Sequence, residues 1–151
     1  MRVPQFLQDQ EVRFETLIHP PVFTAQKRAR RLRVPGKLLA KSVLLRTGNQ
    51  FLVAVLPACR QIDFDRLGTS LAVSVRLATT QEVANVFGDC EWGTTVPFGK
   101  LYGVSTIIDD SFAPDSTIVF EAQRHALTIR MTCRDFERLE KPLRMAFSSG
   151  A

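Results

Sequence analysis

The sequence has few of the residues that build metal sites and disulfide frameworks. Its 151 residues include two histidines and three cysteines, and the cysteines (Cys59, Cys90 and Cys133) lie far apart. No Cys/His pair has the spacing of zinc ligands, and an odd, scattered set of cysteines does not fit a disulfide scaffold. We therefore expect no metal, and we interpret two of the cysteines as small buried hydrophobic residues.

Long apolar runs are also missing. The longest nearly continuous one covers residues 51–58, whereas a membrane-spanning helix needs about 20 apolar residues. The first ten residues contain no apolar core of the kind found in secretory signals. These absences predict a cytoplasmic protein that makes no use of a membrane.

Familiar cofactor and catalytic motifs are absent as well. No dinucleotide-binding glycine motif follows an expected strand, and no P-loop or GxSxG sequence occurs. We expect no cofactor. The composition, 45% hydrophobic and 23% charged, is typical of a soluble globular protein. The length predicts one domain over residues 1–151.

Positive charge is concentrated in one segment. The chain has 20 basic and 15 acidic residues, and seven of the basic residues lie between Gln26 and Lys41, where no acidic residue occurs. The whole basic excess therefore comes from this segment, which is typical of a surface that binds a polyanion. A solvated helix face is the alternative interpretation.

Short strands and helices are interleaved along the chain without strict alternation. This pattern predicts an α+β fold with a mixed, largely antiparallel sheet and flanking helices. Thr24 is the expected N-cap of the basic helix, and Thr79 with Glu82 forms a capping-box pattern. The expected helices cover residues 25–32, 63–70, 80–87 and 133–139, and the expected strands cover residues 40–46, 51–56, 75–78, 104–109, 117–122 and 127–131.

Two local features are candidates for a site. Lys41 lies in an apolar strand, and a lysine in such a run either extends to the surface or serves a site. The glycine- and proline-bounded loop of residues 93–99 can bring backbone N–H groups close to a carbonyl or phosphate. Trp92 and Tyr102 flank this loop, and we expect them to pack against it, with stacking on a nucleic-acid base as the alternative.

An ordered set of short motifs extends over residues 19–139, which is most of the chain. The motifs are His19-Pro20, Thr24-Ala25, Ala40-Lys41-Ser42-Val43, Val55-Leu56-Pro57-Ala58, Arg76-Leu77-Ala78, Glu82, Phe87-Gly88, Gly93-Thr94-Thr95-Val96-Pro97-Phe98-Gly99 and Ile108-Asp109. This set resembles the YbaK and prolyl-tRNA-synthetase-associated editing domain family, and the resemblance implies a sheet that curls toward a barrel.

The resemblance implies a free-standing aminoacyl-tRNA deacylase, without metal or covalent nucleophile. Lys41 would contact the terminal nucleotide of the acceptor end. The loop would hold the aminoacyl ester and position the attacking water, and a pocket would admit only small side chains. The implied catalytic residues are Lys41, Gly93, Thr94, Thr95, Val96 and Pro97, and the implied pocket residues are Phe98, Gly99 and His125. A polar turn residue is the equal alternative for His125.

The basic segment then becomes a candidate surface for acceptor-stem phosphates. Its members are Lys27, Arg28, Arg30, Arg31, Arg33 and Lys37. The expected substrate is alanine on the tRNA for proline, and the alternatives are serine, cysteine or 2-aminobutyrate. The expected partners are the tRNA acceptor end and, as a further candidate, an aminoacyl-tRNA synthetase. A non-catalytic module that binds tRNA or a synthetase is the competing hypothesis, and a small-molecule hydrolase or transferase on the same scaffold is a third.

Overall fold

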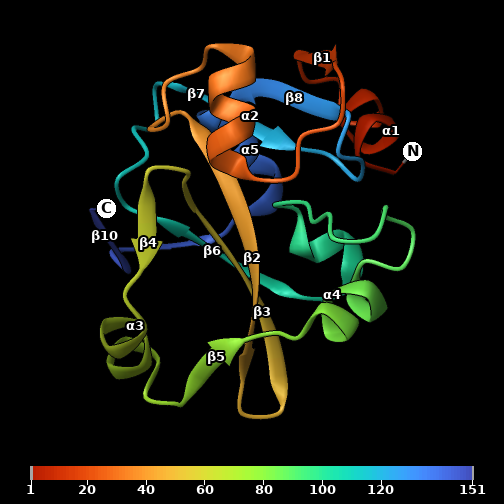
Figure 1. Ribbon diagram of the computed structural model, residues 1–151. Coiled ribbons are helices and arrows are strands. Elements are labelled where there is room, and N and C mark those ends of the chain that lie inside the picture. The colour runs from red at the N-terminus through yellow and green to blue at the C-terminus, as the bar shows by residue number, and fades with distance from the viewer. Residues whose placement is uncertain (1, 151) are drawn as a thin grey trace.

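The computed structural model describes residues 2–150 and consists of sheet and helix segments interleaved along the chain (Figure 1). The helices are α1 (Arg2–Asp9), α2 (Ala25–Leu32), α3 (Phe64–Leu71), α4 (Thr80–Val86) and α5 (Cys133–Glu140), with a 3-10 turn η1 (Gly99–Tyr102). The strands are β1 (Phe14–Ile18), β2 (Leu39–Thr47), β3 (Gln50–Pro57), β4 (Arg60–Ile62), β5 (Val75–Leu77), β6 (Ser105–Asp109), β7 (Thr117–Glu121), β8 (Leu127–Thr132), β9 (Leu143–Met145) and β10 (Ser148–Gly150).

One mixed sheet dominates the fold. Its strands follow the order β1-β8-β7-β2-β3-β6-β9, with β5 paired to the far end of β2, while β4 and β10 form a separate pair. The α+β class and the mixed sheet are confirmed. The curl implied by the resemblance does not close the sheet, because β1 and β9 remain at its two edges.

The long hairpin of β2 and β3 is the centre of the sheet. Its antiparallel pairing extends from Ala40 opposite Pro57 to Thr47 opposite Gln50, as the sequence predicts. Gly48 adopts a positive φ of 64° in the two-residue turn, a conformation that costs glycine little. On its other side, the start of β2 pairs in parallel with β7, Leu39 opposite Val119 and Ala40 opposite Phe120.

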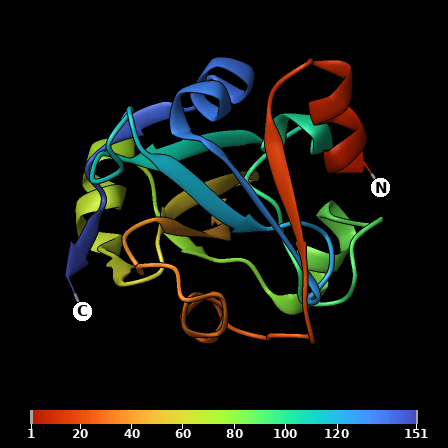
Figure 2. The ribbon, with the colours of Figure 1, turned by 90° about the horizontal axis from the view of Figure 1, so that it is seen from above.

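Helices cover both faces of the sheet, with α2 on one side and α5 on the other (Figure 2). Strand β7 contributes side chains to both faces of the sheet, because successive side chains of a strand point to opposite sides. Ile118 and Phe120 belong to the large core cluster that includes Phe136 of α5. Val119 belongs instead to the smaller cluster under α2.

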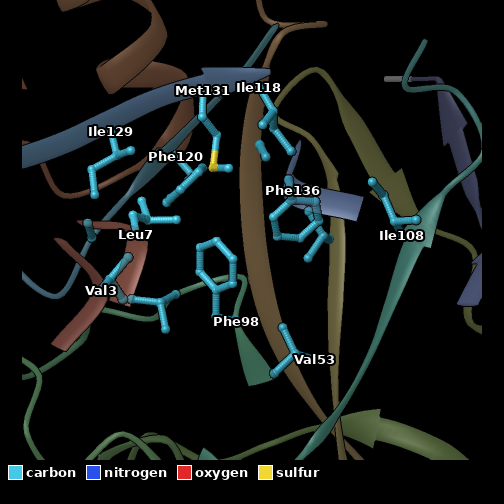
Figure 3. Packing of buried hydrophobic residues seen from close by; sticks show 14 of the residues in the cluster. Val3, Leu7, Val53, Phe98, Ile108, Ile118, Phe120, Ile129, Met131 and Phe136 are labelled. Atoms are coloured by element: carbon cyan, nitrogen blue, oxygen red, sulfur yellow. The ribbon is translucent and has the colours of Figure 1, made fainter. Parts of the chain in front are cut away.

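Phe98 is part of the large core, not of a substrate pocket. It is fully buried, and its ring lies 5.1 Å from that of Phe136 and 5.7 Å from that of Phe120 (Figure 3). The predicted pocket role of Phe98 is therefore wrong, since an apolar ring surrounded by other rings packs the interior.

Gly99 also lies away from any pocket. It is buried at the start of η1, and a Cβ atom placed on it would come within 2.5 Å of the Thr106 hydroxyl and 2.6 Å of the Val104 carbonyl. The absence of a side chain at this position permits close packing of η1 against β6. The predicted pocket role of Gly99 is wrong for this reason.

A buried ion pair fixes α2 on the sheet. Arg28 is only 2% exposed, and its guanidinium donates to Glu121 Oε1 of β7 at 2.9 Å and to Thr128 Oγ1 of β8 at 2.7 Å. It also donates to the Val22 carbonyl at 3.1 Å. The prediction that Arg28 contacts tRNA phosphates is wrong, because its side chain points inward and its charge is already paired.

Several short elements were not expected from the sequence, namely α1, β1, β4, β9 and β10. Apart from α1, each is five residues or shorter, and such short segments carry little periodicity. None of the helices within residues 2–150 is long and apolar enough to cross a membrane.

Arg28→Ala should lower the free energy of unfolding by about 3–5 kcal/mol, because it leaves Glu121 partly buried without its cationic partner. Denaturant unfolding followed by circular dichroism measures this change. Arg30→Ala is the matched control on the same helix, and its exposed position predicts a change within about 0.5 kcal/mol. Equal effects of the two substitutions would contradict the assigned role of Arg28.

Candidate active site

A small cavity of about 90 Å³ lies between the N-terminal half of α2 and the adjoining ends of β2 and β7. Four separate parts of the chain close it, namely the start of α2, the start of β2, the loop after Trp92 and the end of β7. Its lining residues are Phe23, Thr24, Ala25, Arg28, Leu39, Ala40, Lys41, Ser42, Gly93, Thr95 and Glu121. The structure thus brings together the strand lysine and part of the loop that the sequence singled out.

Lys41 reaches this cavity because of its position in β2. The parallel pairing of Ala40 with Phe120 makes Lys41 and Glu121 the next residues along the two strands. Both line the cavity, and strand alternation directs both toward the α2 face of the sheet.

The charge of Lys41 is available to a ligand. Within residues 2–150, no carboxylate lies within 4.0 Å of its ammonium group, although the side chain is half-buried. Burial lowers the pKa of Lys41, and the Cys59 side chain opposes this shift. An unpaired, partly desolvated cation attracts an anionic group strongly, since water screens it less than a surface charge.

Glu121 is the functional residue that the sequence analysis missed. One carboxylate oxygen accepts from Arg28 of α2 at 2.9 Å, and the other accepts from the Thr95 backbone N–H at 3.0 Å. Burial raises the pKa of Glu121, while the Thr95 and Arg28 bonds oppose the increase. The only sequence signal was an acidic residue in the otherwise apolar run of residues 118–122.

The loop is fixed to the sheet at two successive threonines. The Thr95 hydroxyl donates to the Ser42 carbonyl of β2 at 2.8 Å. The Thr94 hydroxyl is buried and donates to the carbonyls of Glu91 and Gln123, at 2.6 and 3.1 Å. These bonds hold the loop against β2 and against the turn between β7 and β8.

Only part of the predicted loop meets the cavity. Gly93 and Thr95 line it, whereas the Thr94 side chain is buried and Val96 belongs to the large core. Pro97 is buried next to Val96. Thr94, Val96 and Pro97 do not line the cavity, and their buried side chains support the loop, so a direct role for their backbone groups stays a prediction.

The first turn of α2 contributes unpaired donors and a favourable dipole. Thr24 is the N-cap, as predicted, and its hydroxyl accepts from the Lys27 backbone N–H at 3.1 Å. Thr24 and Ala25 both line the cavity. The first backbone N–H groups of a helix have no partner within it, and the helix dipole favours an anion there.

His125 lies behind the cavity wall, not in it. Its Nε2 lies 2.9 Å from the Trp92 carbonyl, and its ring packs on Phe23 with centroids 4.6 Å apart. A Cβ atom on Gly93, which has a φ of 84°, would lie 3.7 Å from the imidazole. Gly93 thus separates His125 from the cavity, so the predicted lining role of His125 is corrected to a supporting one.

The aromatic residues that flank the loop behave differently from each other. Tyr102 packs edge-on against Phe87, with ring centroids 4.8 Å apart, and donates to Asp89, and both partners precede the loop. Trp92 is instead 59% exposed, so the expectation that it packs against the loop is wrong.

The remaining predicted cations stay on the surface. Lys27, Arg30 and Arg31 project from α2, and Arg33 and Lys37 follow it, all of them exposed. None of the five forms an ion pair with another residue in the described part of the chain. They form a cationic strip along and after α2 (Lys27, Arg30, Arg31, Arg33 and Lys37), and Arg30 and Arg33 also line a separate groove on the far side of this helix.

Two wider grooves, of about 530 and 550 Å³, lie elsewhere on the surface. The first runs along β1 and β8, and the second lies between the far side of α2 and Cys59. Neither contains Lys41 or a residue of the loop. Across residues 2–150, no group of three or more His, Cys, Asp or Glu side chains is placed to hold a metal ion. The small cavity is therefore where the candidate chemistry converges.

Comparisons with solved structures give the same fold. Hypothetical protein APE2540 superimposes with a TM-score of 0.89 over 99% of this chain and 100% of its own, at 16% identity. A protein described as a candidate trans-editing enzyme for prolyl-tRNA synthetase gives a TM-score of 0.80 over 99% of this chain and 96% of its own, at 15% identity. A candidate signal-transduction protein from Marinobacter aquaeolei VT8 gives 0.73 at 20% identity, covering 97% of this chain but 30% of its own.

Sequence comparison identifies the family. No curated protein matches the chain. Residues 19–139, however, match the family described as the aminoacyl-tRNA editing domain, and this segment contains every residue that lines the cavity. The chain belongs to the aminoacyl-tRNA editing domain family.

Proposed function

We propose that this protein is a trans-acting aminoacyl-tRNA deacylase that hydrolyses the ester of a small noncognate amino acid. The observation that carries the proposal is the small cavity, in which an unpaired Lys41 faces the loop of Gly93 and Thr95 in a chain of the editing-domain family. Free-standing action is supported by the neighbour described as a candidate trans-editing enzyme for prolyl-tRNA synthetase, which this chain covers almost completely.

The chemistry requires positioning and charge stabilisation more than a nucleophilic side chain. An aminoacyl ester is already activated, so a positioned water and a donor for the developing oxyanion suffice for hydrolysis. The Gly93 N–H has no acceptor among the described residues, and we assign it to the ester oxygen. Thr95 cannot share this task through its own N–H, since that group donates to Glu121.

Lys41 has the role of holding the terminal nucleotide. Its ammonium and the first turn of α2 both attract an anion, and a phosphate is the anion that the acceptor end offers. A phosphate held there would orient the attached ester toward Gly93. The surrounding desolvation makes this contact worth more than the same contact at the surface.

The cavity size favours a small substrate side chain. The cavity of about 90 Å³ would also hold the ester beside Gly93, which favours a short substrate side chain over a branched or ring side chain. Alanine on the tRNA for proline is the substrate that we propose. Serine, cysteine and 2-aminobutyrate are the alternatives of similar size. A binding module without activity remains the competing function, and the assay below separates it from a deacylase.

Lys41→Ala should reduce kcat/KM for deacylation by about 100-fold or more, because it removes a cation of the cavity that has no ion-pair partner among the described residues. Release of labelled amino acid from a panel of mischarged tRNAs measures the effect and identifies the substrate. Folding should be preserved, as Lys41 forms no ion pair within the described residues.

Lys141→Ala is the matched control, since it removes an exposed lysine that belongs neither to the cavity nor to the cationic strip. Activity that Lys41→Ala and Lys141→Ala reduce equally would contradict the site assignment. Binding of tRNA without release of any amino acid from the panel would favour the binding module. Unfolding of Lys41→Ala would make the lysine a structural residue.

The cationic strip should act through the tRNA backbone. Replacing Lys27, Arg30 and Arg31 together by Gln should raise KM and reduce the slope of log affinity against log salt by about 2–3, because each phosphate contact contributes about 0.7–0.9. The matched control replaces Arg134, Arg138 and Lys141 by Gln at α5, on the opposite face of the sheet (Figure 2). An equal change of slope in both triple variants would indicate a general charge effect and contradict the strip.

A further inference from the structure

Large apolar side chains are exposed around one turn. Of the seven such side chains exposed in residues 2–150, three lie on segments bonded to the turn between β7 and β8. Ile18 is 84% exposed and pairs with Leu127, and Phe23 is 69% exposed and lies against His125. Trp92 is 59% exposed, and its carbonyl is bonded to His125. Isolated exposed apolar residues are common, but a group beside a cavity marks a binding surface.

The imidazole of His125 contacts both Trp92 and Phe23. A carbonyl can only accept, so His125 Nε2 must carry the proton that it donates to the Trp92 carbonyl at 2.9 Å. The same ring packs on Phe23 with an interplanar angle of 51°. His125 is itself anchored, because its backbone N–H donates to Glu91 Oε1 at 2.8 Å. The support beneath the aromatic residues is therefore fixed before any ligand arrives.

Both aromatic residues adjoin the mouth of the cavity. Phe23 is one of its lining residues, and Trp92 directly precedes Gly93, which is another. A ligand whose reacting group enters the cavity beside Lys41 therefore has both side chains within reach of its remaining part.

We propose that Phe23 and Trp92, supported by His125, form a stacking platform for the unpaired terminal base of a nucleic acid whose 3′ end enters the cavity. This inference rests on the proposed function and identifies how the base at the reacting end is held. Aromatic side chains stack on any base through its π-face. The adjoining cationic strip and the unpaired Lys41 favour a polyanionic ligand over an apolar protein partner.

The experiment uses intrinsic fluorescence, since Trp92 is the only tryptophan in the chain. The probe is a short single-stranded RNA ending in CCA, compared with the same RNA carrying an abasic 3′-terminal residue. The intact RNA should change the Trp92 emission saturably, and removal of the terminal base should weaken binding by about ten-fold. Phe23→Ala should weaken binding of the intact RNA to a similar extent and have little effect on the abasic RNA.

Phe64→Ala is the matched control, because Phe64 is also exposed but lies on α3 and does not line the cavity. It should leave the affinity for both RNAs unchanged. Equal affinities for intact and abasic RNA, unchanged Trp92 emission, or no RNA binding would each overturn the platform. A Trp92 emission that changes with protein concentration but not with RNA would indicate self-association through this surface. That result would also overturn the platform.

The RNA probe carries no amino acid and therefore no ester, so its binding does not depend on hydrolysis. Saturable, base-dependent binding without deacylation of any mischarged tRNA would contradict the proposed function and support the platform. Lys41-dependent deacylation without dependence on the terminal base would support the proposed function and contradict the platform.

Discussion

The candidate site depends on the ion pair and the backbone hydrogen bond that the Glu121 carboxylate accepts. This carboxylate stands at the end of β7, with one oxygen bonded to Arg28 of α2 and the other to the backbone of Thr95. Three segments that are remote in the sequence therefore meet at a single group. Because the pair is largely shielded from water, loss of either partner leaves an uncompensated charge, which is far more costly than loss of a surface pair. The small cavity exists where these segments are held together.

This arrangement also determines the charge that a ligand encounters. Arg28 and Glu121 neutralise each other, so neither contributes a free charge to the cavity. Lys41, next to Glu121 on the neighbouring strand, has no such partner among residues 2–150, and the first turn of α2 adds the positive end of its dipole. Outside the cavity, the cationic strip continues the positive potential over the surface of α2. A phosphate approaching from solvent thus meets positive charge both on the surface of α2 and in the cavity.

Local sequence signals predicted the elements that carry the site. The N-cap at Thr24, the hairpin around Gly48 and the strand position of Lys41 depend on neighbouring residues, and all three are confirmed. Long-range pairing was not predictable, since Arg28 and Glu121 are 93 residues apart. Arg28 looked like its exposed neighbours because a buried and a surface arginine have the same sequence signature. Phe98 was misassigned because a motif does not reveal which of its side chains enter the core.

The most direct test of the proposed active site is to locate a bound substrate analogue. Adenosine carrying alanine through a 3′ amide instead of an ester cannot be hydrolysed by the proposed reaction at a useful rate. Its titration, followed by backbone amide NMR, should shift the signals of Lys41, Ser42 and Gly93 most strongly, with a saturable dependence on concentration. Shifts confined to the groove between Arg13 and Arg130, or no saturable shift at all, would contradict the assignment of this cavity as the active site.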